Sequence, residues 1–351
     1  MARPAFHELP VARVDRLCAD AVAVTFDVPP HLADDYAFLP GQYLTLRREV
    51  EGVEERRSYS ICAPPGAAPR IGVRRVENGL FSARIVDSLA PGDTLEVLPP
   101  LGRFTPKEVT GQHAFVVAGS GITPALSIMD TVLTSGGHVT LLYGNRRTDT
   151  VMFADELADL KDRHPDRFQL VHVLSREPRD VELFSGRLDA DRLTRLLGTV
   201  VPTSDVDHWW LCGPYGMLTD ADVALTAHAV PRDRVHRELF HVDEPPPEPK
   251  RADESTVEGP VAEVTVVLDG RETTLHLPAD TPILDAAQRV RADLPFACKG
   301  GVCGTCRARV TTGQVEMRRN YALEEHEVAA GFVLTCQALP LSAEVTVDYD
   351  A

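Results

Sequence analysis

Nine residues near the end of the chain, CKGGVCGTC, contain three cysteines and three glycines. Four residues separate Cys298 from Cys303, and two separate Cys303 from Cys306. A fourth cysteine, Cys336, follows after a further 29 residues. Four thiols in this pattern predict one shared centre, so this part of the chain must fold in a way that brings Cys336 back to the loop.

Three structures can explain such a loop: a disulfide knot, a zinc site or an iron–sulfur cluster. Seven cysteines fit poorly with a fully paired framework, and disulfides are rare in the cytosol. A four-cysteine zinc site more often has two separate C-x2-C pairs, whereas C-x4-C-x2-C…C is the spacing of plant-type [2Fe–2S] ligation. We expect Gly300, Gly301 and Gly304 to take positive φ angles, so that backbone amides point at the sulfurs. The pattern favours the cluster, with zinc or free thiols as the alternatives.

The overall composition limits the other functions of the chain. A length of 351 residues predicts two or three domains. The net charge of −16 argues against nucleic-acid binding and disfavours binding to an anionic membrane surface. The first residues lack the apolar segment of a signal peptide, and no stretch reaches 18 consecutive apolar residues. We therefore expect a cytosolic protein without a nucleic-acid or membrane partner.

Composition also predicts where the domains end. Residues 243–260, DEPPPEPKRADESTVEGP, are rich in proline and charge and predict an extended linker. A second change, near residue 110, separates short β-like runs from alternating strands and helices. We predict domains over residues 5–109, 110–242 and 261–351.

The first domain has β-like runs, punctuated by Gly and Pro, at residues 21–28, 43–49, 56–62, 70–76 and 93–100. With one helix at 80–90, they predict a small antiparallel barrel or sandwich. The second domain alternates apolar strands with helices, which indicates a doubly wound parallel sheet. Its strands are expected at 114–119, 138–144, 168–175 and 208–213, and its helices at 124–135, 151–163, 189–197 and 216–228. The third begins with a hairpin around Asp269-Gly270, followed by a helix at 282–291 and further strands, which predicts a small sheet crossed by one helix.

Two loops before residue 130 have the character of phosphate sites. In AGSGITPALS, Gly119 and Gly121 allow close approach of a pyrophosphate, Thr123 can act as the N-cap and Pro124 can begin the helix. Because Pro124 stands where G-x-G-x-x-G has its third glycine, this loop alone is more typical of an ordinary β–α turn than of a nucleotide site. The runs RRSYS (56–60) and NGLFSAR (78–84) add an arginine, an aromatic ring, hydroxyls and a second helix start.

Together these runs resemble the ferredoxin–NADP reductase superfamily, and the last domain resembles a plant-type ferredoxin with a β-grasp fold. The stretches that carry the resemblance are Arg57-Ser58-Tyr59-Ser60, Gly79-Leu80-Phe81-Ser82, Gly119 to Pro124, Cys212-Gly213-Pro214 and the cysteine loop. The implied order is a flavin barrel, a pyridine-nucleotide domain and a ferredoxin, as in the reductase components of multicomponent oxygenases. Residues 173–188, 236–240 and 317–340 most resemble the phenylacetyl-CoA epoxidase subfamily of these reductases.

The resemblance implies roles for the residues that match it. Arg57 would bind the flavin pyrophosphate, Tyr59 would cover the isoalloxazine and Ser60 would hydrogen-bond its reactive edge. The flavin phosphates would be held by Gly79, Phe81 and Ser82.

On the nucleotide side, Thr123 and Cys212-Gly213 would flank the nicotinamide, behind the loop of Gly119, Gly121 and Pro124. The segment HRELF places Glu238 and Phe240 either near the flavin or simply at a strand end. The cluster would be held by Cys298, Cys303, Cys306 and Cys336.

The choice of coenzyme depends on Ser175 and Arg176, which follow the third strand of the nucleotide domain. An arginine here favours the 2′-phosphate of NADPH, whereas an acidic residue such as the adjacent Glu177 favours NADH. We expect NADPH, with NADH as the alternative, and FAD rather than FMN.

The resulting hypothesis is a reductase that passes electrons from NADPH through FAD and a [2Fe–2S] cluster to the oxygenase subunits of a multicomponent, di-iron complex. The subfamily resemblance implies phenylacetyl-CoA epoxidation in phenylacetate catabolism as the process served. One alternative is an NADH-dependent reductase of a steroid or aromatic-ring hydroxylase. Another is a flavin and iron–sulfur module that senses redox state or carries electrons.

Overall fold

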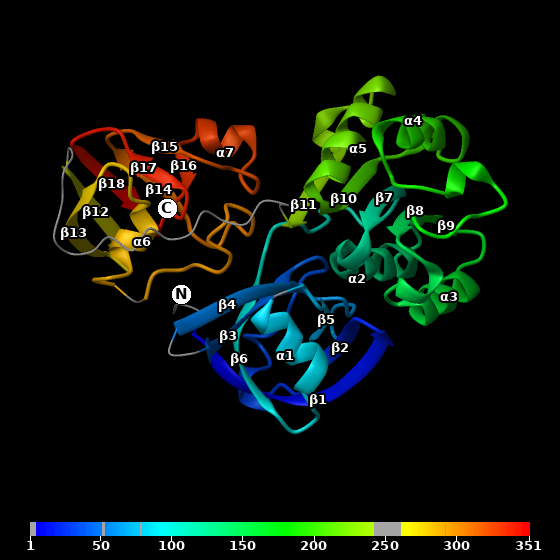
Figure 1. The fold of residues 1–351 in the computed structure, drawn as a ribbon, viewed down its shortest axis with the longest axis horizontal. Helices are drawn as coiled ribbons and strands as arrows, with labels where there is room; N and C mark the ends of the chain where they lie inside the picture. The colour runs from blue at the N-terminus through cyan, green and yellow to red at the C-terminus, as the bar shows by residue number, and fades with distance from the viewer. Residues whose placement is uncertain (1–4, 51–52, 78, 242–260, 292) are drawn as a thin grey trace. The chain divides into compact units, whose positions relative to one another are not determined.

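The computed structural model describes residues 5–50, 53–77, 79–241, 261–291 and 293–351. The chain divides into two compact units, Met1–His241 and Val242–Ala351 (Figure 1). The predicted linker over 243–260 lies outside the described residues. Within the described ranges, no helix is long and apolar enough to cross a membrane.

The N-terminal sheet has six antiparallel strands in the order β4-β3-β6-β1-β2-β5. They are β1 (His7–Cys18), β2 (Ala21–Phe26), β3 (Tyr43–Val50), β4 (Val53–Ser60), β5 (Arg70–Arg74) and β6 (Thr94–Leu101). A bridge between Ile61 and Ile71 joins the two ends of this order, so the sheet closes into a barrel. Helix α1 (Leu80–Ser88) buries Phe81 and Ile85 in the barrel core. The predicted antiparallel barrel is confirmed, although β1 was not predicted.

The second sheet is parallel, in the order β11-β10-β7-β8-β9. Its strands are β7 (Gln112–Ala118), β8 (His138–Asn145), β9 (Phe168–Leu174), β10 (His208–Pro214) and β11 (Val235–His241). Its helices are α2 (Ile122–Thr134), α3 (Ala154–Arg163), α4 (Ala190–Thr199) and α5 (Tyr215–Ala227). Helices α2 and α3 cover one face and α4 and α5 the other (Figure 1). The doubly wound sheet is confirmed.

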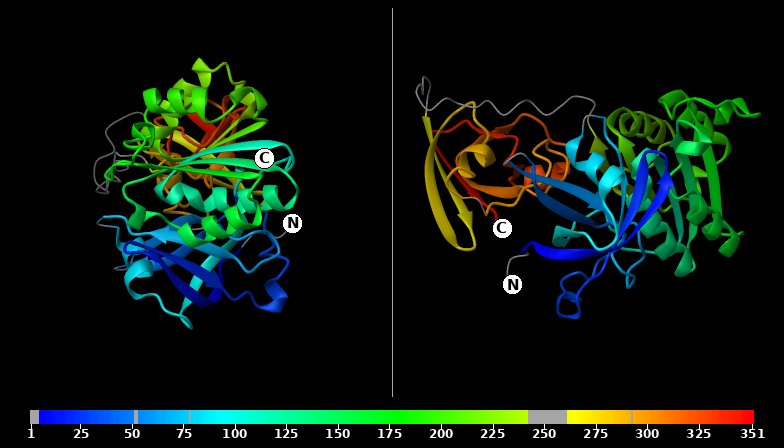
Figure 2. Two further views of the ribbon diagram at one scale, coloured as in Figure 1. Left: turned by 90° about the vertical axis from the view of Figure 1, so that its right-hand side faces the viewer. Right: turned by 60° about the horizontal axis from the view of Figure 1, so that its bottom comes forward.

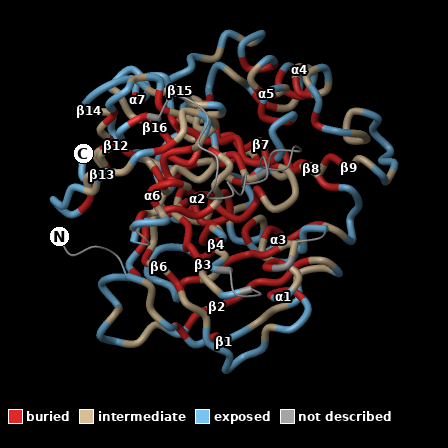
Figure 3. Tube along the Cα trace, turned by 60° about the vertical axis from the view of Figure 1, so that its left-hand side comes forward, coloured by how far each residue is buried: buried red, intermediate tan, exposed pale blue. Residues whose placement is uncertain are grey.

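The barrel and the parallel sheet share buried contacts, which makes them one unit. Ala21 and Ala23 of β2 and Cys62 belong to the same apolar cluster as Ile128 and Met129 of α2. Figure 3 shows the buried stretches running through the central strands and α2. Packing of this kind fixes the end of the barrel strands against the start of the nucleotide domain.

The C-terminal unit contains a five-stranded sheet in the order β13-β12-β18-β14-β16, with a separate pair β15-β17. Figure 2 shows this unit in yellow to red. These strands are β12 (Val261–Leu268), β13 (Arg271–Pro278), β14 (Arg307–Thr312), β15 (Val315–Met317), β16 (Phe332–Leu334), β17 (Ala338–Pro340) and β18 (Glu344–Asp348). Asp269 and Gly270 have φ angles of 53° and 66°, as expected for the predicted hairpin turn.

Two short helices complete the C-terminal unit, α6 (Ile283–Ala287) and α7 (Glu325–Ala329). Helix α6 ends before the predicted residue 291. Beyond Ala287 the chain continues in turns, with Val290 exposed, before Leu294 is buried in the core. The small sheet crossed by one helix is the ferredoxin-like arrangement expected from the resemblance.

Candidate functional site

The order of the parallel sheet reverses between β7 and β10, and the predicted nucleotide loops meet at this point. In doubly wound sheets, ligands bind where the strand order reverses, at the carboxyl ends of the strands. Gly119 and Gly121 follow β7, while Cys212 and Gly213 lie at the end of β10. A Cβ atom on Gly121 would lie 2.2 Å from the carbonyl oxygen of Cys212. The two loops therefore touch through backbone, and only glycine fits at residue 121.

Helix α2 begins two residues earlier than the sequence indicated, because a 3-10 turn over Gly119–Gly121 leads directly into it. The predicted N-cap role of Thr123 is wrong, since the N-cap is Gly121. Thr123 lies in the first turn, where its Oγ1 donates to the carbonyl oxygen of Ser120 at 3.0 Å. Pro124 is buried in the same turn. A helix N-terminus at this loop favours an anion, as a pyrophosphate site requires.

The barrel contributes Arg74, a residue that the sequence did not single out. Its guanidinium NH1 lies 3.3 Å from the position of a Cβ on Gly119. The same side chain donates to the backbone oxygen of Thr150 and forms an ion pair with Asp20 at 3.3 Å. It therefore places a positive charge beside the predicted pyrophosphate loop.

The predicted flavin residues lie on β4 and at the start of α1. The Tyr59 ring is 6.2 Å from the Phe81 ring, centroid to centroid, and burial raises the pKa of the Tyr59 hydroxyl. Ser82 Oγ accepts a hydrogen bond from the Val76 amide at 3.0 Å. A Cβ atom on Gly79 would lie 2.9 Å from Ser82 Oγ. Glycine at residue 79 thus permits the tight turn that begins α1.

Arg57 is exposed on β4, close to these residues but engaged elsewhere. Its NH2 lies 2.6 Å from Glu55 Oε2, and its NH1 donates to the carbonyl oxygen of Arg56 at 2.7 Å. An exposed pair of this kind contributes little free energy. The arginine can therefore exchange Glu55 for a phosphate at low cost.

Ser60, Cys212 and Glu238 meet where the barrel joins the parallel sheet. Ser60 Oγ donates to Glu238 Oε2 at 3.3 Å, and Glu238 pairs with Cys212 in the register of β11 and β10. Desolvation raises the pKa of Glu238 to about 8, and the Ser60 hydrogen bond opposes this rise without cancelling it. Burial and the neighbouring Glu238 charge also raise the pKa of the Cys212 thiol. At neutral pH the cluster is therefore mostly protonated.

The coenzyme residues follow β9, at the same carboxyl edge of the sheet. Glu177 accepts two hydrogen bonds from Thr148, from its backbone N at 2.8 Å and its Oγ1 at 2.7 Å. These bonds lower the pKa of the Glu177 carboxyl. The exposed Arg176 side chain has no hydrogen-bond or ion-pair partner in the described part of the chain, and the Ser175 amide donates to Asn145.

The arginines of the preceding loop are less available. Arg146 lies 3.6 Å from Asp20, and Arg147 lies 3.1 Å from Asp149. Within the described residues, Arg176 thus keeps an unpaired guanidinium just after β9.

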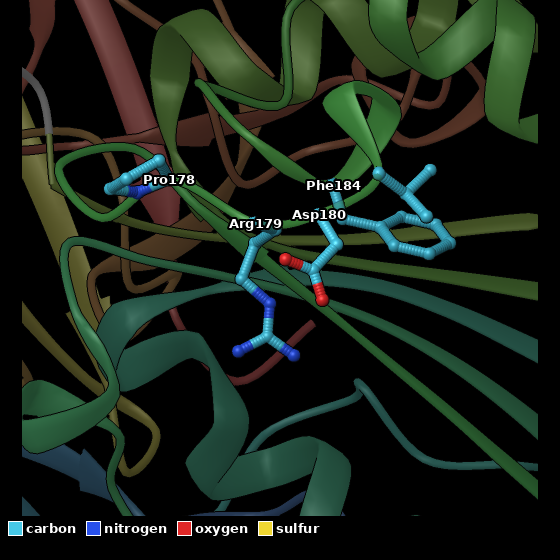
Figure 4. Close-up of a pocket in the computed structure, with 5 residues that line it drawn as sticks. Pro178, Arg179, Asp180 and Phe184 are labelled. Atoms are coloured by element: carbon cyan, nitrogen blue, oxygen red, sulfur yellow. The ribbon is translucent and has the colours of Figure 1, made fainter.

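Two pockets open beside these residues and share Arg179, which the sequence did not single out. One, of about 380 Å³, is lined by Pro178, Arg179, Asp180, Val181 and Phe184 (Figure 4). The other, of about 270 Å³, is lined by Thr148, Val151, Ala154, His172, Leu174 and Arg179. The run SREPR following a predicted strand was the available signal for this second arginine.

The four predicted cysteine ligands lie in the C-terminal unit and associate as two pairs. The thiols of Cys298 and Cys303 interact most strongly with each other, as do those of Cys306 and Cys336, and Cys306 also interacts more weakly with Cys303 and Cys298. The amides of Gly300 and Cys303 donate to Cys298 Sγ at 3.3 and 3.4 Å. The Cys303 thiol and the backbone amides lower the pKa of Cys298 to about 6.

The glycines of this loop differ partly from expectation. Gly301 and Gly304 have φ angles of 78° and 68°, as predicted. The prediction is wrong for Gly300, since Lys299 takes the positive φ angle instead, at 52°. The turn is therefore one residue earlier, and it still directs the Gly300 amide at Cys298.

The donor set fits a binuclear cluster. Among the described residues, no group of three or more His, Cys, Asp or Glu side chains is placed to hold a single metal ion. Two pairs of thiols, with backbone amides directed at one sulfur, suit two irons that each take two cysteines.

A barrel with a flavin-type strand, a nucleotide sheet and a four-cysteine ferredoxin unit define an iron–sulfur flavoprotein reductase. Comparisons with known protein families support this class of protein. The matching families are "Oxidoreductase FAD-binding domain" over residues 8–105, "Oxidoreductase NAD-binding domain" over 115–222 and "2Fe-2S iron-sulfur cluster binding domain" over 266–341. The chain is an NAD(P)H-dependent oxidoreductase with FAD and [2Fe–2S] as its cofactors.

Individual relatives give a more specific classification of the protein. The chain is 44% identical over 354 residues to one of the subunits of the 1,2-phenylacetyl-CoA epoxidase of Escherichia coli, covering 99% of this chain and 98% of the relative. It is 35% identical to the "3-ketosteroid-9-alpha-monooxygenase, ferredoxin reductase component" of Rhodococcus rhodochrous, covering 97% and 96%. The fold matches phthalate dioxygenase reductase with a TM-score of 0.61 at 24% identity, covering 98% of both chains. The chain belongs to the family of oxygenase reductases with FAD-binding, NAD-binding and [2Fe–2S] domains.

Proposed function

We propose that this protein is the reductase component of a phenylacetyl-CoA epoxidase, and that it passes electrons from NADPH to a di-iron oxygenase component. The observation that carries the proposal is the 44% identity with the E. coli epoxidase protein along the whole chain. We assign the FAD-binding barrel to residues 5–109, the nucleotide domain to 110–242, the linker to 243–260 and the ferredoxin domain to 261–351. A cytosolic location remains a prediction.

The cofactors supply the redox chemistry: a nicotinamide hydride, a flavin that accepts it, and a cluster that carries single electrons. The protein supplies binding and orientation. In the proposed flavin site Arg57 exchanges Glu55 for the pyrophosphate, and Tyr59 covers the ring. The start of α1 holds the phosphates through Gly79, Phe81 and Ser82, with Ser82 also keeping its turn in place.

At the nucleotide site, the loop formed by Gly119, Gly121, Thr123 and Pro124 binds the pyrophosphate, with Arg74 as an additional cation. Cys212 and Gly213 flank the nicotinamide. Ser60, at the end of barrel strand β4, and Glu238, on β11 of the parallel sheet, meet beside Cys212, and the Ser60 hydroxyl donates to the carboxyl group. A carboxyl with a pKa near 8 keeps a proton available there at neutral pH.

The proposed preference for NADPH rests on the different interactions of Arg176 and Glu177 with the rest of the protein. Ribose hydroxyls need an acceptor, but both Glu177 oxygens already accept from Thr148. A 2′-phosphate needs a cation, and the Arg176 side chain is exposed and unpaired within the described residues. Ser175 adds a hydroxyl beside it. We propose Ser175 and Arg176 as the residues that read the 2′-phosphate.

In the C-terminal unit, Cys298 and Cys303 would bind one iron, and Cys306 and Cys336 the other. The backbone amides that donate to Cys298 stabilise the negative charge on its sulfur.

The proposal is tested by reconstitution. The purified protein is combined with the oxygenase subunits of the E. coli phenylacetyl-CoA epoxidase, phenylacetyl-CoA and either NADPH or NADH. We expect the epoxide to form faster with NADPH. Product formation only with a 3-ketosteroid oxygenase component and NADH would overturn the assignment, and the 35% identity with a ketosteroid reductase makes that the informative comparison.

A further inference from the structure

The fourth cysteine is attached to the cysteine loop through both of its neighbours. Thr335 donates to the carbonyl oxygen of Cys306, from its backbone N at 3.1 Å and from Oγ1 at 3.0 Å. On the other side, Gln337 Nε2 donates to the carbonyl oxygen of Lys299 at 2.8 Å. Thr335 therefore positions one cysteine of its own pair, whereas Gln337 reaches across to the other pair.

If Gln337 served only to fill space, a buried glutamine would destabilise the fold compared with an apolar residue of the same size. The side chain is 1% exposed, and its Cγ would be 3.1 Å from a Cβ on Gly301. Within the described residues its Oε1 is buried with no hydrogen-bond donor. A methionine of the same length would fill the space without leaving a polar atom unsatisfied. The useful part of the side chain is therefore its N–H group.

The Gln337 N–H group influences the sulfur of Cys298 by orienting the peptide between Lys299 and Gly300. The Lys299 carbonyl and the Gly300 amide belong to the same planar peptide, so fixing the oxygen also fixes the direction of the N–H. The Gly300 amide donates to Cys298 Sγ at 3.3 Å. Lys299 has a φ angle of 52°, which is unfavourable for a residue with a side chain and needs support from its surroundings. Gln337 supplies that support.

The same amide also lies beside the second pair of cysteines. Gln337 Nε2 is 3.9 Å from Cys336 Sγ, within the longer range of hydrogen bonds to sulfur. One buried side chain thus directs a donor at a sulfur in each pair. Donors to the sulfurs favour the more negative, reduced form of a cluster.

We propose that Gln337 is a positioning residue that raises the reduction potential of the [2Fe–2S] cluster by polarising the peptide directed at Cys298 and donating to Cys336. The proposal rests on the cluster assignment but not on the identity of the oxygenase. The predicted quantity is the reduction potential of the cluster, which can be measured in this protein without an oxygenase partner.

The test compares Gln337→Met with the wild type and with Gln314→Leu, which removes an exposed amide from the same unit. Cluster content is checked by absorbance and iron analysis, and the midpoint potential is measured by redox titration followed by EPR. We expect Gln337→Met to keep the cluster while the equilibrium constant for its reduction falls about tenfold, which is about 59 mV for one electron. Gln314→Leu should match the wild type.

A second variant keeps the proposal testable if Gln337→Met loses the cluster. Gln337→Glu keeps the length, removes the donor and adds negative charge, so its potential should fall further. An unchanged potential in either loaded variant would overturn the role of Gln337, and loss of the cluster from both would leave it a structural role only and also overturn the proposal. A wild-type chain without a [2Fe–2S] signature would instead overturn the cluster assignment.

Discussion

Replacement of Glu238 by Gln should stabilise the flavin unit at neutral pH and leave its stability unchanged in acid. Desolvation raises the Glu238 pKa from 4.5 to about 8. The folded state therefore keeps a proton that the unfolded chain releases above pH 4.5. Because the folded form binds more protons in this window, stability falls as pH rises from about 4.5 and levels off above about 8. Glutamine accepts the Ser60 hydrogen bond without this penalty.

The size of the effect follows from the shift. Between pH 4.5 and pH 7 the linkage amounts to about 3 kcal/mol at 1.36 kcal/mol per pH unit. Glu238 remains partly exposed, so solvent screening reduces the penalty to about 1–2 kcal/mol. For a unit of this size, that corresponds to an increase of about 2–8 °C in the unfolding midpoint.

The assay follows thermal unfolding through the release of flavin fluorescence at pH 5 and pH 7.5. Glu8→Gln, an exposed carboxylate on β1, is the matched control and should show no pH-dependent difference. The difference between Glu238→Gln and the wild type should be near zero at pH 5 and positive at pH 7.5. A difference that is the same at both pH values would refute the reasoning, because it would mean that Glu238 does not titrate in this range.

Three further substitutions test the rest of the proposed relay. Cys336→Ser should abolish the cluster absorbance while NADPH still bleaches the flavin in stopped flow; electron arrival at a retained cluster would contradict its role as ligand. Arg176→Ala should lower the NADPH/NADH ratio of kcat/KM about 10- to 100-fold, the worth of a charged hydrogen bond, whereas Arg195→Ala on α4 should not. Gly121→Ala should cost about 1–3 kcal/mol of stability by overpacking against the Cys212 carbonyl and raise the KM for NADPH. Gly216→Ala, where nothing lies within 4 Å, is its control in equilibrium unfolding.

The regular parts of the fold were predictable because their signals are local. Apolar strands alternating with amphipathic helices identified the parallel sheet, and Asp269-Gly270 identified the hairpin. Strand β1 was missed because Leu9 and Val11 are its only buried residues and much of the strand is exposed. Its place in the barrel comes from pairing with β2 and β6, which no local pattern reveals.

Candidate site residues could be predicted by type, while their contacts depend on tertiary structure. The turn in the cysteine loop illustrates the limit. Glycine tolerates a positive φ angle, so Gly300 was the natural choice, yet the folded loop places that angle on Lys299. The hydrogen bond from Gln337 to the Lys299 carbonyl spans 38 residues. No rule based on neighbouring residues includes such a partner.

The candidate coenzyme residues also show that tertiary contacts decide what the sequence leaves open. In the sequence, Arg176 and Glu177 are adjacent and support opposite coenzymes, so their order alone leaves the choice open. In the folded protein Glu177 accepts two hydrogen bonds from Thr148, a residue of the loop after β8, whereas the Arg176 side chain has no partner within the described residues. Thr148 has no charge and does not belong to any of the recognised stretches, but it determines which neighbour can meet a ligand. Replacing it with Val would remove the Oγ1 donor and leave Glu177 Oε1 free to accept from a ribose, while the backbone N–H still binds Oε2, and the coenzyme preference should then move toward NADH.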